Sequence, residues 1–269
     1  MKQARRNFLT TTVAGGAAFI ALGMLRSSQA YATPFNSAAA GAKNLTDAFK
    51  GLGAQQMIES KDILIKAPEI AESGAIVPVE VWSKLVGISS IAILVEKNPN
   101  PLTAHFAMAT GTEGYVNTRM KMSGSSPVHV IVQAGGKYYH AMKDVKVTLG
   151  GCGGGGGQAI EKDFTVEPVK VRTTMEADLC SVKLVMNHPM ESGQRRDART
   201  GQVVPAHYIQ NVNATLNGRT VMDAQWSQSI AKNPFLGFKV KGARSGDRIT
   251  VAWVDNLGNK NSTDALIGA

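Results

Sequence analysis

The residues with the clearest capacity for chemistry are a cysteine and the glycines around it, between Leu149 and Gly157. Cys152 is the only residue with a reactive side chain in this stretch. Its neighbours are Gly150, Gly151, Gly153, Gly154, Gly155, Gly156 and Gly157. Glycine has no Cβ, so the stretch has little to pack and a freely rotating backbone. A thiol forms and breaks S–S bonds reversibly. The stretch therefore predicts either a flexible linker with an incidental thiol or an arm that presents a thiol to another molecule.

The chain has one other cysteine, Cys180, at the start of a predicted strand. A permanent bond between the two cysteines would remove the mobility that the glycines provide, so we expect no disulfide. Cys180 is predicted to be a small packed or surface thiol. His188, Met190 and His207 are residue types that bind copper or zinc. No CxxC, HxH or helical HxxxH spacing accompanies them, so we predict no metal site.

His129 and His140 are the candidates for a base beside a cysteine nucleophile, but neither has a local signature of that role. We expect both to be ordinary strand residues. The glycine run is followed by neither a Lys-Ser/Thr pair nor a helix, which excludes a Walker motif and a dinucleotide fingerprint. No cofactor is predicted.

The composition is that of a globular protein with ample core material: of 269 residues, 43% are hydrophobic and 18% are charged. The length suits a signal segment followed by two domains. The formal net charge is +9, but four basic residues lie before position 31, which leaves 25 basic against 20 acidic residues in the rest. This mildly basic chain has no long Lys/Arg run, which argues against nucleic-acid binding.

The N-terminus carries Arg5 and Arg6 ahead of Phe8-Leu9, followed by an apolar run from Val13 to Leu25. This order predicts a twin-arginine signal peptide over residues 1–32, with cleavage after Ala30 or Ala32. The run is too short for a permanent membrane anchor. The mature protein is therefore expected in the periplasm, where oxidised thiols persist.

Short runs of alternating apolar and polar residues predict β-strands on both sides of the cysteine. We expect one β-sandwich over residues 33–149, with a short helix capped by Asn44, and a second over residues 167–269. Residues 150–166 form the arm and linker. Val145, Val147 and Leu149 alternate with polar residues in the last strand before the cysteine. Because an extended chain spans at most about 3.6 Å per residue, Cys152 stands within about 10 Å of Leu149.

Several segments resemble SoxY, the cysteine-bearing sulfur carrier of bacterial thiosulfate oxidation, and others resemble its partner SoxZ. The SoxY-like segments are 68–74 (PEIAESG), 77–79 (VPV), 98–101 (NPNP), 118–122 (TRMKM) and 145–154 (VKVTLGGCGG). The SoxZ-like segments are 188–194 (HPMESGQ), 205–207 (PAH), 225–226 (QW), 232–235 (KNPF) and 253–256 (WVDN).

This resemblance to a fused SoxYZ implies an all-β fold of two immunoglobulin-like β-sandwich domains joined by a glycine-rich arm, with a short N-terminal helix in the first. It implies a carrier without catalysis of its own that holds sulfur intermediates covalently on Cys152. The expected partners are a SoxAX-like haem enzyme, a SoxB-like hydrolase and a sulfane dehydrogenase. Two other functions stay open: an accessory protein of another periplasmic dehydrogenase, and a thiol enzyme that uses the same cysteine.

One departure from the family pattern concerns the end of the arm. In SoxY the glycine-cysteine motif ends the chain, whereas here Gly155, Gly156 and Gly157 continue into the second half. An arm tethered at both ends would have to enter a partner as a loop. A cut after Cys152 is the alternative, and we expect the uncut form.

Overall fold

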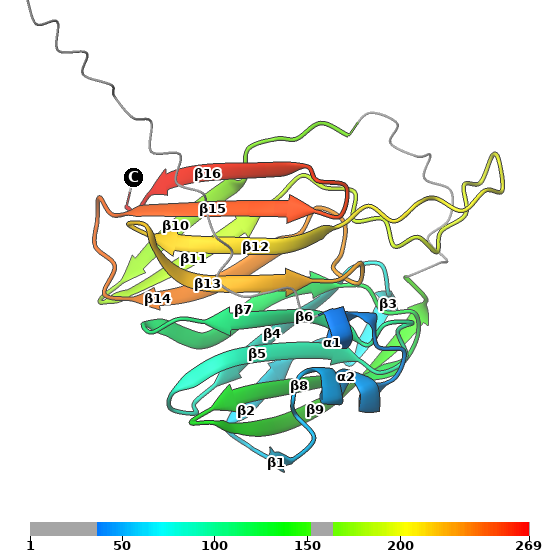
Figure 1. Ribbon diagram of the computed structural model, residues 1–269, viewed down its shortest axis with the longest axis horizontal. Helices are drawn as coiled ribbons and strands as arrows, with labels where there is room; N and C mark the ends of the chain where they lie inside the picture. Colours follow the sequence, from blue (N-terminus) through cyan, green and yellow to red (C-terminus); the bar gives the residue numbers. More distant parts are fainter. Residues whose placement is uncertain (1–36, 152–163, 269) are drawn as a thin grey trace, which may run out of the picture. The chain divides into compact units, whose positions relative to one another are not determined.

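β-Strands dominate the computed structural model, which describes residues 37–151 and 164–268 (Figure 1). The predicted signal peptide, Cys152 and the glycines from Gly153 to Gly157 lie outside the described residues. We call residues 37–151 the first half and residues 164–268 the second half.

The first half contains two short helices and nine strands. They are α1 (Ser37–Gly41), α2 (Leu45–Gly51), β1 (Met57–Glu59), β2 (Ile63–Lys66), β3 (Ile70–Ser73), β4 (Val77–Ser83), β5 (Ile88–Val95), β6 (Leu102–Met108), β7 (Thr112–Met120), β8 (Ser126–Ala134) and β9 (Lys137–Leu149). The second half contains β10 (Lys170–Glu176), β11 (Leu179–Val185), β12 (Ile209–Leu216), β13 (Arg219–Trp226), β14 (Phe235–Lys241), β15 (Arg248–Asp255) and β16 (Lys260–Leu266). The prediction of an all-β protein is confirmed.

Both sheets run from one half into the other (Figure 1). The ten-stranded sheet has the order β1-β9-β8-β5-β6-β13-β12-β15-β16, with β3 also paired to β9. The six-stranded sheet has the order β10-β11-β14-β7-β4-β2. The halves join where β6 pairs antiparallel with β13 and where β14 pairs antiparallel with β7. The two halves are therefore hydrogen-bonded into shared sheets.

One hydrophobic core lies between the sheets and draws side chains from both halves. Its largest members include Phe106 from the first half and Trp226, Phe238 and Trp253 from the second. Strand alternation accounts for it: in β2, Ile63 and Ile65 are buried while the residues between and after them are exposed.

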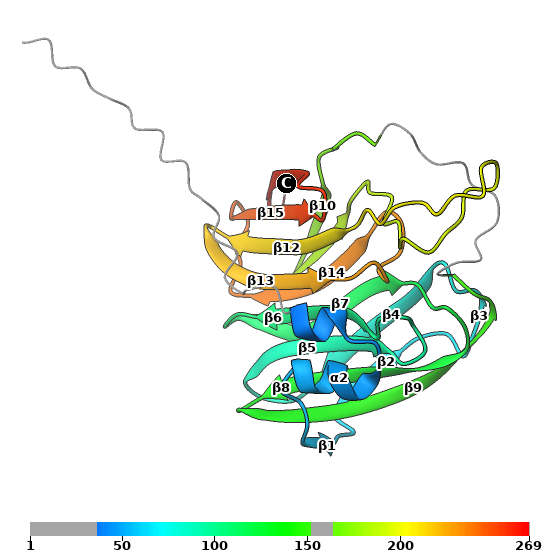
Figure 2. The same ribbon diagram turned by 45° about the vertical axis from the view of Figure 1, so that its right-hand side comes forward.

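The two helices lie over β5, β6 and β8, on the outer face of the ten-stranded sheet (Figure 2). The side chain of Asn44 accepts a hydrogen bond from the Asp47 backbone at 2.9 Å, which confirms the predicted N-cap of α2. Gly53 follows the helix with a φ of +73°, a left-handed conformation that favours glycine. The other helix, α1, was not predicted.

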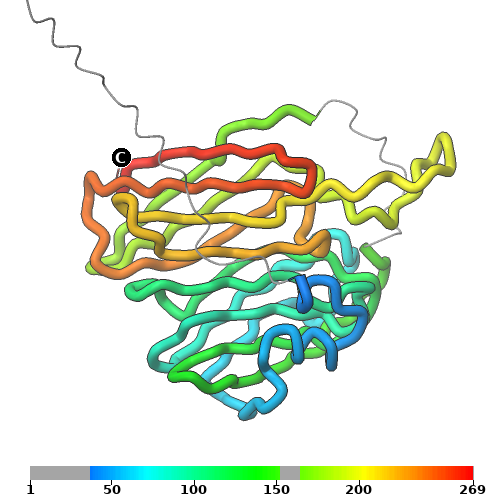
Figure 3. The backbone as a smooth tube through the Cα atoms, viewed as in Figure 1, coloured from blue at the N-terminus to red at the C-terminus, as the bar shows by residue number. Residues whose placement is uncertain are grey.

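A two-residue turn reverses the chain direction between β12 and β13 in the second half. Asn217 and Gly218 both have positive φ, as predicted for the two-residue hairpin between β12 and β13. The segment between β11 and β12 is long and runs beyond the strand ends (Figure 3). Among the described residues, no helix has the length and apolarity to span a membrane.

Candidate functional site

Strand β9 leads the chain toward Cys152, which itself lies outside the described residues. Val145 is buried and Val147 partly buried, as the alternation predicted. Leu149 is exposed, which the alternation did not predict. The reason is its position: the pairing of β8 with β9 ends at Val145, so Leu149 lies past the end of β8 and next to the short edge strand β3.

Three backbone hydrogen bonds hold the chain just before the cysteine. The Gly74 N–H donates to the carbonyl of Leu149 at 2.7 Å, and the Met122 N–H donates to the carbonyl of Gly74 at 2.8 Å. The Gly151 N–H then donates to the carbonyl of Met122 at 2.8 Å. We call Gly74, Met122, Gly150 and Gly151 the glycine clamp.

The glycine clamp is packed so closely that a side chain would not fit at any of its glycines. A Cβ on Gly151 would overlap the backbone of Gly74, and a Cβ on Gly74 would overlap the carbonyl oxygen of Met122. A Cβ on Gly150 would overlap the carbonyl oxygen of Ser123. The sequence placed Gly150 and Gly151 in the flexible arm. The structure corrects this for these two residues, because close backbone packing and hydrogen bonding fix them to the fold.

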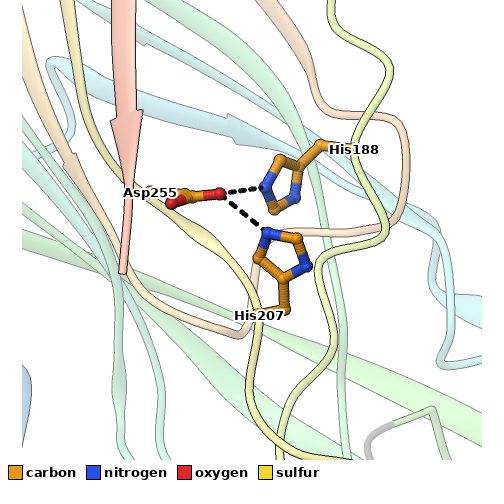
Figure 4. A group of neighbouring side chains, drawn as sticks. All are labelled: His188, His207 and Asp255. Carbon is orange, nitrogen blue, oxygen red and sulfur yellow. Dashed lines mark hydrogen bonds and ion pairs between the residues drawn. The ribbon is translucent and has the colours of Figure 1, made fainter. Parts of the chain in front are cut away.

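The described chain resumes at Phe164, whose ring packs on two histidines. The centroid of the Phe164 ring lies 4.9 Å from the centroid of the His188 ring and 5.0 Å from that of the His207 ring. Both ring pairs pack edge-on. Both histidines turn their Nε2 atoms toward the same carboxylate oxygen of Asp255 (Figure 4). The Nε2–Oδ2 distance is 3.3 Å for His188 and 2.7 Å for His207.

Asp255 accepts hydrogen bonds on both of its oxygens. Besides the two imidazoles, Oδ2 accepts a bond from the side-chain amide of Asn259 at 2.8 Å. Oδ1 accepts the backbone N–H groups of Leu257 and Asn259 at 2.9 and 2.8 Å. Burial by itself would raise the pKa of Asp255, but the hydrogen bonds from Asn259, His207 and His188 outweigh it and hold the pKa below its ordinary value. Asp255 is thus a fully partnered carboxylate.

The tautomer of His188 follows from its neighbours. Its Nδ1 accepts the backbone N–H of Met190 at 3.1 Å, so in the neutral ring the proton is on Nε2 and is donated to Asp255. Burial, together with the nearby charges of His207 and Lys121, lowers the pKa of His188 to about 4 against the opposing effect of Asp255. His188 is therefore a neutral imidazole at neutral pH.

The ligand atoms of His188, His207 and Asp255 lie within 4.8 Å of one another, a spacing that a metal ion could bridge. The surroundings of His188 argue against this. A metal on Nε2 would shift the proton to Nδ1, where it would face the N–H of Met190, donor against donor. Metal-bound histidines normally donate their second ring N–H to an acceptor. The three side chains fit a hydrogen-bond network better than a metal site. We call them the Asp255 cluster.

A buried lysine connects the glycine clamp to the Asp255 cluster. Lys121 precedes Met122 of the clamp, and its ammonium group donates to the carbonyl of Met190 and, at 3.0 Å, to that of Gln228. Met190 has a φ of +48°, a left-handed conformation that is uncommon outside glycine, and its N–H bonds His188. The connection spans both halves of the chain.

The remaining residues singled out in the sequence are structural. Cys180 is buried and free, and burial raises the pKa of its thiol, so the prediction of a packed thiol is confirmed. His129 and His140 lie in strands β8 and β9, as predicted, and their side chains meet: His129 Nδ1 and His140 Nε2 lie 3.0 Å apart, and His129 also bonds Glu96. On the same strand as His140, Tyr138 packs under α2 and donates its hydroxyl to the carbonyl of Leu52.

Sequence reasoning missed Gly74, Phe164 and Asp255. Gly74 follows a short edge strand and Asp255 begins a sequence that reads as a turn, so each had a simpler structural explanation. A close approach of three separate segments leaves no local pattern in the chain, which is why the clamp could not be found.

Comparison with known proteins identifies both halves. The family model described as "Sulfur oxidation protein SoxY" matches residues 49–152, and the one described as "Sulphur oxidation protein SoxZ" matches residues 169–265. Among solved structures, the sulfur carrier protein SoxY from Chlorobium limicola f thiosulfatophilum is 41% identical, with a TM-score of 0.37, over 42% of this chain and 97% of that one.

A superoxide reductase (neelaredoxin) from Ignicoccus hospitalis is 20% identical, with a TM-score of 0.29, over 32% of this chain and 79% of that one. No curated protein matches the chain. The two family matches follow one another in a single polypeptide, the first ending at Cys152 and the second beginning at residue 169. The chain therefore belongs to the SoxY and SoxZ families of sulfur oxidation proteins, as a SoxY sulfur-carrier half followed by a SoxZ half.

Proposed function

We propose that this protein carries thiosulfate-derived sulfur intermediates on Cys152 in the periplasm and presents them to partner enzymes. The observation that carries the proposal is the SoxY family match, whose last residue is Cys152 itself. The other cysteine supports it by elimination. Cys180 is buried, and a raised pKa keeps it in the unreactive thiol form.

The first step is an oxidative conjugation by a SoxAX-like haem enzyme. The Cys152 thiolate and thiosulfate form an S–S bond, and two electrons leave to the acceptor of the haem enzyme. The product is a cysteine S-thiosulfonate, R–S–S–SO₃⁻. A SoxB-like hydrolase then adds water, releases sulfate and two protons, and leaves a persulfide, R–S–S⁻. A sulfane dehydrogenase oxidises the remaining sulfur. The carrier itself has no cofactor and catalyses none of these steps.

The twin arginines, Arg5 and Arg6, in the predicted signal peptide support the proposed location. An oxidising compartment suits a carrier whose cargo is held by an S–S bond. Intact mass of the protein recovered from the periplasm tests the location. The expected result is one chain that begins after Ala30 or Ala32, and two masses would show a cut after Cys152.

Incubation of the reduced, full mature chain with thiosulfate, the haem enzyme and an oxidised electron acceptor tests the carrier function. We expect a mass increase of one S₂O₃ group on Cys152, lost on treatment with a thiol reductant. The matched variants are Cys152→Ser, which should take no label, and Cys180→Ser, which should take as much as the unchanged protein. An adduct on Cys180, or no adduct while the enzyme conjugates another thiol, contradicts the proposal.

A further inference from the structure

The two sheets differ in what covers their outer faces. Helices α1 and α2 pack on β5, β6 and β8 of the ten-stranded sheet (Figure 2). They are the only helices in residues 37–151 and 164–268, so within these ranges no helix lies over the six-stranded sheet. Four strands of that sheet, β10, β11, β14 and β7, are paired in this order, and their register aligns the outward side chains in rows across the strands.

One row carries a cation at each end and apolar groups between them. Lys170 pairs with Val185, and Val185 pairs with Phe235. The Arg119 guanidinium lies over the Phe235 ring, 5.1 Å from its centroid, and closes the row on β7. In β11, β14 and β7 the residues on either side along the strand are buried, which places this row on the outer face. Both cations are exposed, and Val185 is 37% exposed between them.

The next row places two cations directly opposite each other. Arg172 and Lys183 are cross-strand partners in β10 and β11, and both are exposed. Like charges in this position destabilise a sheet. Lys183 pairs on its other side with Gly237, which adds no side chain to the row. Any polar residue would serve the fold at these exposed positions, so a repulsive pair here favours a role outside the fold.

The uncompensated positive charge of the outer face is concentrated in these two rows. We call Arg119, Lys170, Arg172, Lys183, Val185 and Phe235 the basic patch. Within residues 37–151 and 164–268, its four cations make no ion pair. Elsewhere on the same face the lysines are paired. Lys66 lies 3.4 Å from Glu80, and Lys239 lies 3.9 Å from Glu176.

The basic patch draws on both halves of the chain. Arg119 belongs to β7 of the first half, and the other five residues belong to β10, β11 and β14 of the second. The patch is complete only where β14 pairs with β7. A protein that binds the whole patch therefore recognises the joined carrier.

We propose that the basic patch is a docking surface for an enzyme that acts on Cys152, which meets it with a carboxylate-rich surface that has an apolar centre. Charge complementarity identifies the occupant, because four cations attract an acidic surface and Arg119 can hold a carboxylate with two hydrogen bonds. Val185 and Phe235 supply the apolar centre that protein interfaces have inside a polar border. The proposal rests on the proposed carrier function and specifies how partners recognise the carrier.

Electrostatic docking suits a carrier that several enzymes visit in turn. Complementary charges raise the rate of association more than they raise the final affinity. The carrier can then meet each enzyme quickly and still leave it.

Binding measured without chemistry tests the docking surface. The full mature chain carrying Cys152→Ser is titrated separately with the thiosulfate-conjugating haem enzyme and with the hydrolase. Arg172→Glu combined with Lys183→Glu reverses two charges of the patch and replaces one repulsive pair by another, so the fold should be equally stable. We expect Kd for at least one enzyme to rise about tenfold at low salt, through slower association. The difference should vanish near 1 M NaCl, where charges are screened beyond about 3 Å.

The matched control makes the same change of net charge on the other sheet. Lys137→Glu combined with Lys260→Glu reverses two exposed lysines, on β9 and β16. We expect this control to change Kd by less than about twofold, because its charges lie outside the patch.

Lys183→Glu alone separates docking from folding. It places a carboxylate directly opposite Arg172, so a cross-strand repulsion becomes an attraction. Thermal unfolding should occur at no lower temperature than in the unchanged protein, while Kd for the enzyme rises about threefold. Residues with only a structural role would move both measurements in the same direction.

The outcomes that overturn the docking surface are distinct. They are an unchanged Kd with both enzymes, an equal loss in the control, or no binding of the unchanged protein to either enzyme. So is binding to phosphatidylglycerol vesicles or duplex DNA that only the patch variant loses while enzyme binding stays intact. Labelling by thiosulfate separates the two proposals. If the patch binds an enzyme but Cys152 takes no adduct, the docking surface stands and the carrier function fails. If the patch variant with Cys152 intact is labelled at an unchanged KM, the carrier function stands and the docking surface fails.

Discussion

The two ends of the segment that contains Cys152 are held by opposite means. Before it, the glycine clamp uses only backbone groups, and its hydrogen bonds include no ionisable side chain. After it, Phe164 packs on the Asp255 cluster, where side chains make the contacts and burial lowers the pKa of His188. The first end therefore tolerates no added atom at its glycines but is indifferent to pH. The second end depends on protonation.

The largest loss of stability is expected from replacing Asp255, the carboxylate at the centre of the Asp255 cluster. Asp255→Ala would remove the acceptor from the buried N–H of His188 and from the partly buried side chains of His207 and Asn259. We expect a loss of about 3–5 kcal/mol in the free energy of unfolding, measured by denaturant titration. Asp264→Asn, which alters an exposed ion pair with Arg248, is the control and should change stability by less than about 0.5 kcal/mol. Equal losses in the two variants would contradict the assigned role of Asp255.

Acidification should weaken the second end and leave the first intact. His188 has a folded pKa of about 4, lowered from 6.5, so between these values the unfolded chain binds a proton that the folded chain does not. Stability is complete above pH 6.5 and falls as the pH drops toward 4, by about 3 kcal/mol for His188. Asp255 does not contribute to this loss of stability between pH 6.5 and pH 4. Its pKa in the folded chain is lowered from 3.8, so its carboxyl group stays ionised at these pH values.

Thermal unfolding at pH 7 and pH 4.5 checks this dependence. His188→Gln should reduce the loss on acidification, and the part that remains belongs to other groups such as His105, whose pKa burial lowers to about 4. Hydrogen exchange of the Gly151 amide, corrected for its intrinsic rate, should stay protected between pH 7 and pH 5. Loss of that protection in step with His188 titration would show that the two ends are not independent.

A smaller loss of stability is expected from adding one methyl group to the glycine clamp. Gly151→Ala places a Cβ against the backbone of Gly74, and we expect a cost of about 1–3 kcal/mol in unfolding free energy. Gly124→Ala is the matched control, since a Cβ there meets nothing within 4 Å. Denaturant titration of both variants gives the comparison. An unchanged stability in Gly151→Ala would mean that the clamp opens easily.

Local alternation was sufficient to predict most strands but not the weak ones. The bounds of β5 and β13 follow directly from apolar runs between turn residues. The pattern was insufficient for β16, whose sequence KNSTDAL has only two apolar residues, both at its C-terminal end, and for the short edge strands β1 and β3. These strands form because β9 and β15 offer an edge for hydrogen bonding, which their own residues do not reveal.

The candidate site was predicted only in part, for a similar reason. A reactive cysteine among glycines is visible in the sequence, because both the thiol and the absence of side chains are local properties. The glycine clamp and the Asp255 cluster are not visible. Gly74, Met122 and Gly151 meet only when three distant segments pack together, and His188 and Asp255 are 67 residues apart in the chain.

The pairing of β6 with β13 and of β14 with β7 has a consequence for assembly. A first half on its own would end its sheets in two bare strand edges, each with unpaired N–H and C=O groups that recruit other chains. In one polypeptide, the matching edges meet by an intramolecular reaction, at an effective concentration of the order of millimolar. The rate of joining should therefore be first order, and dilution should not separate the halves.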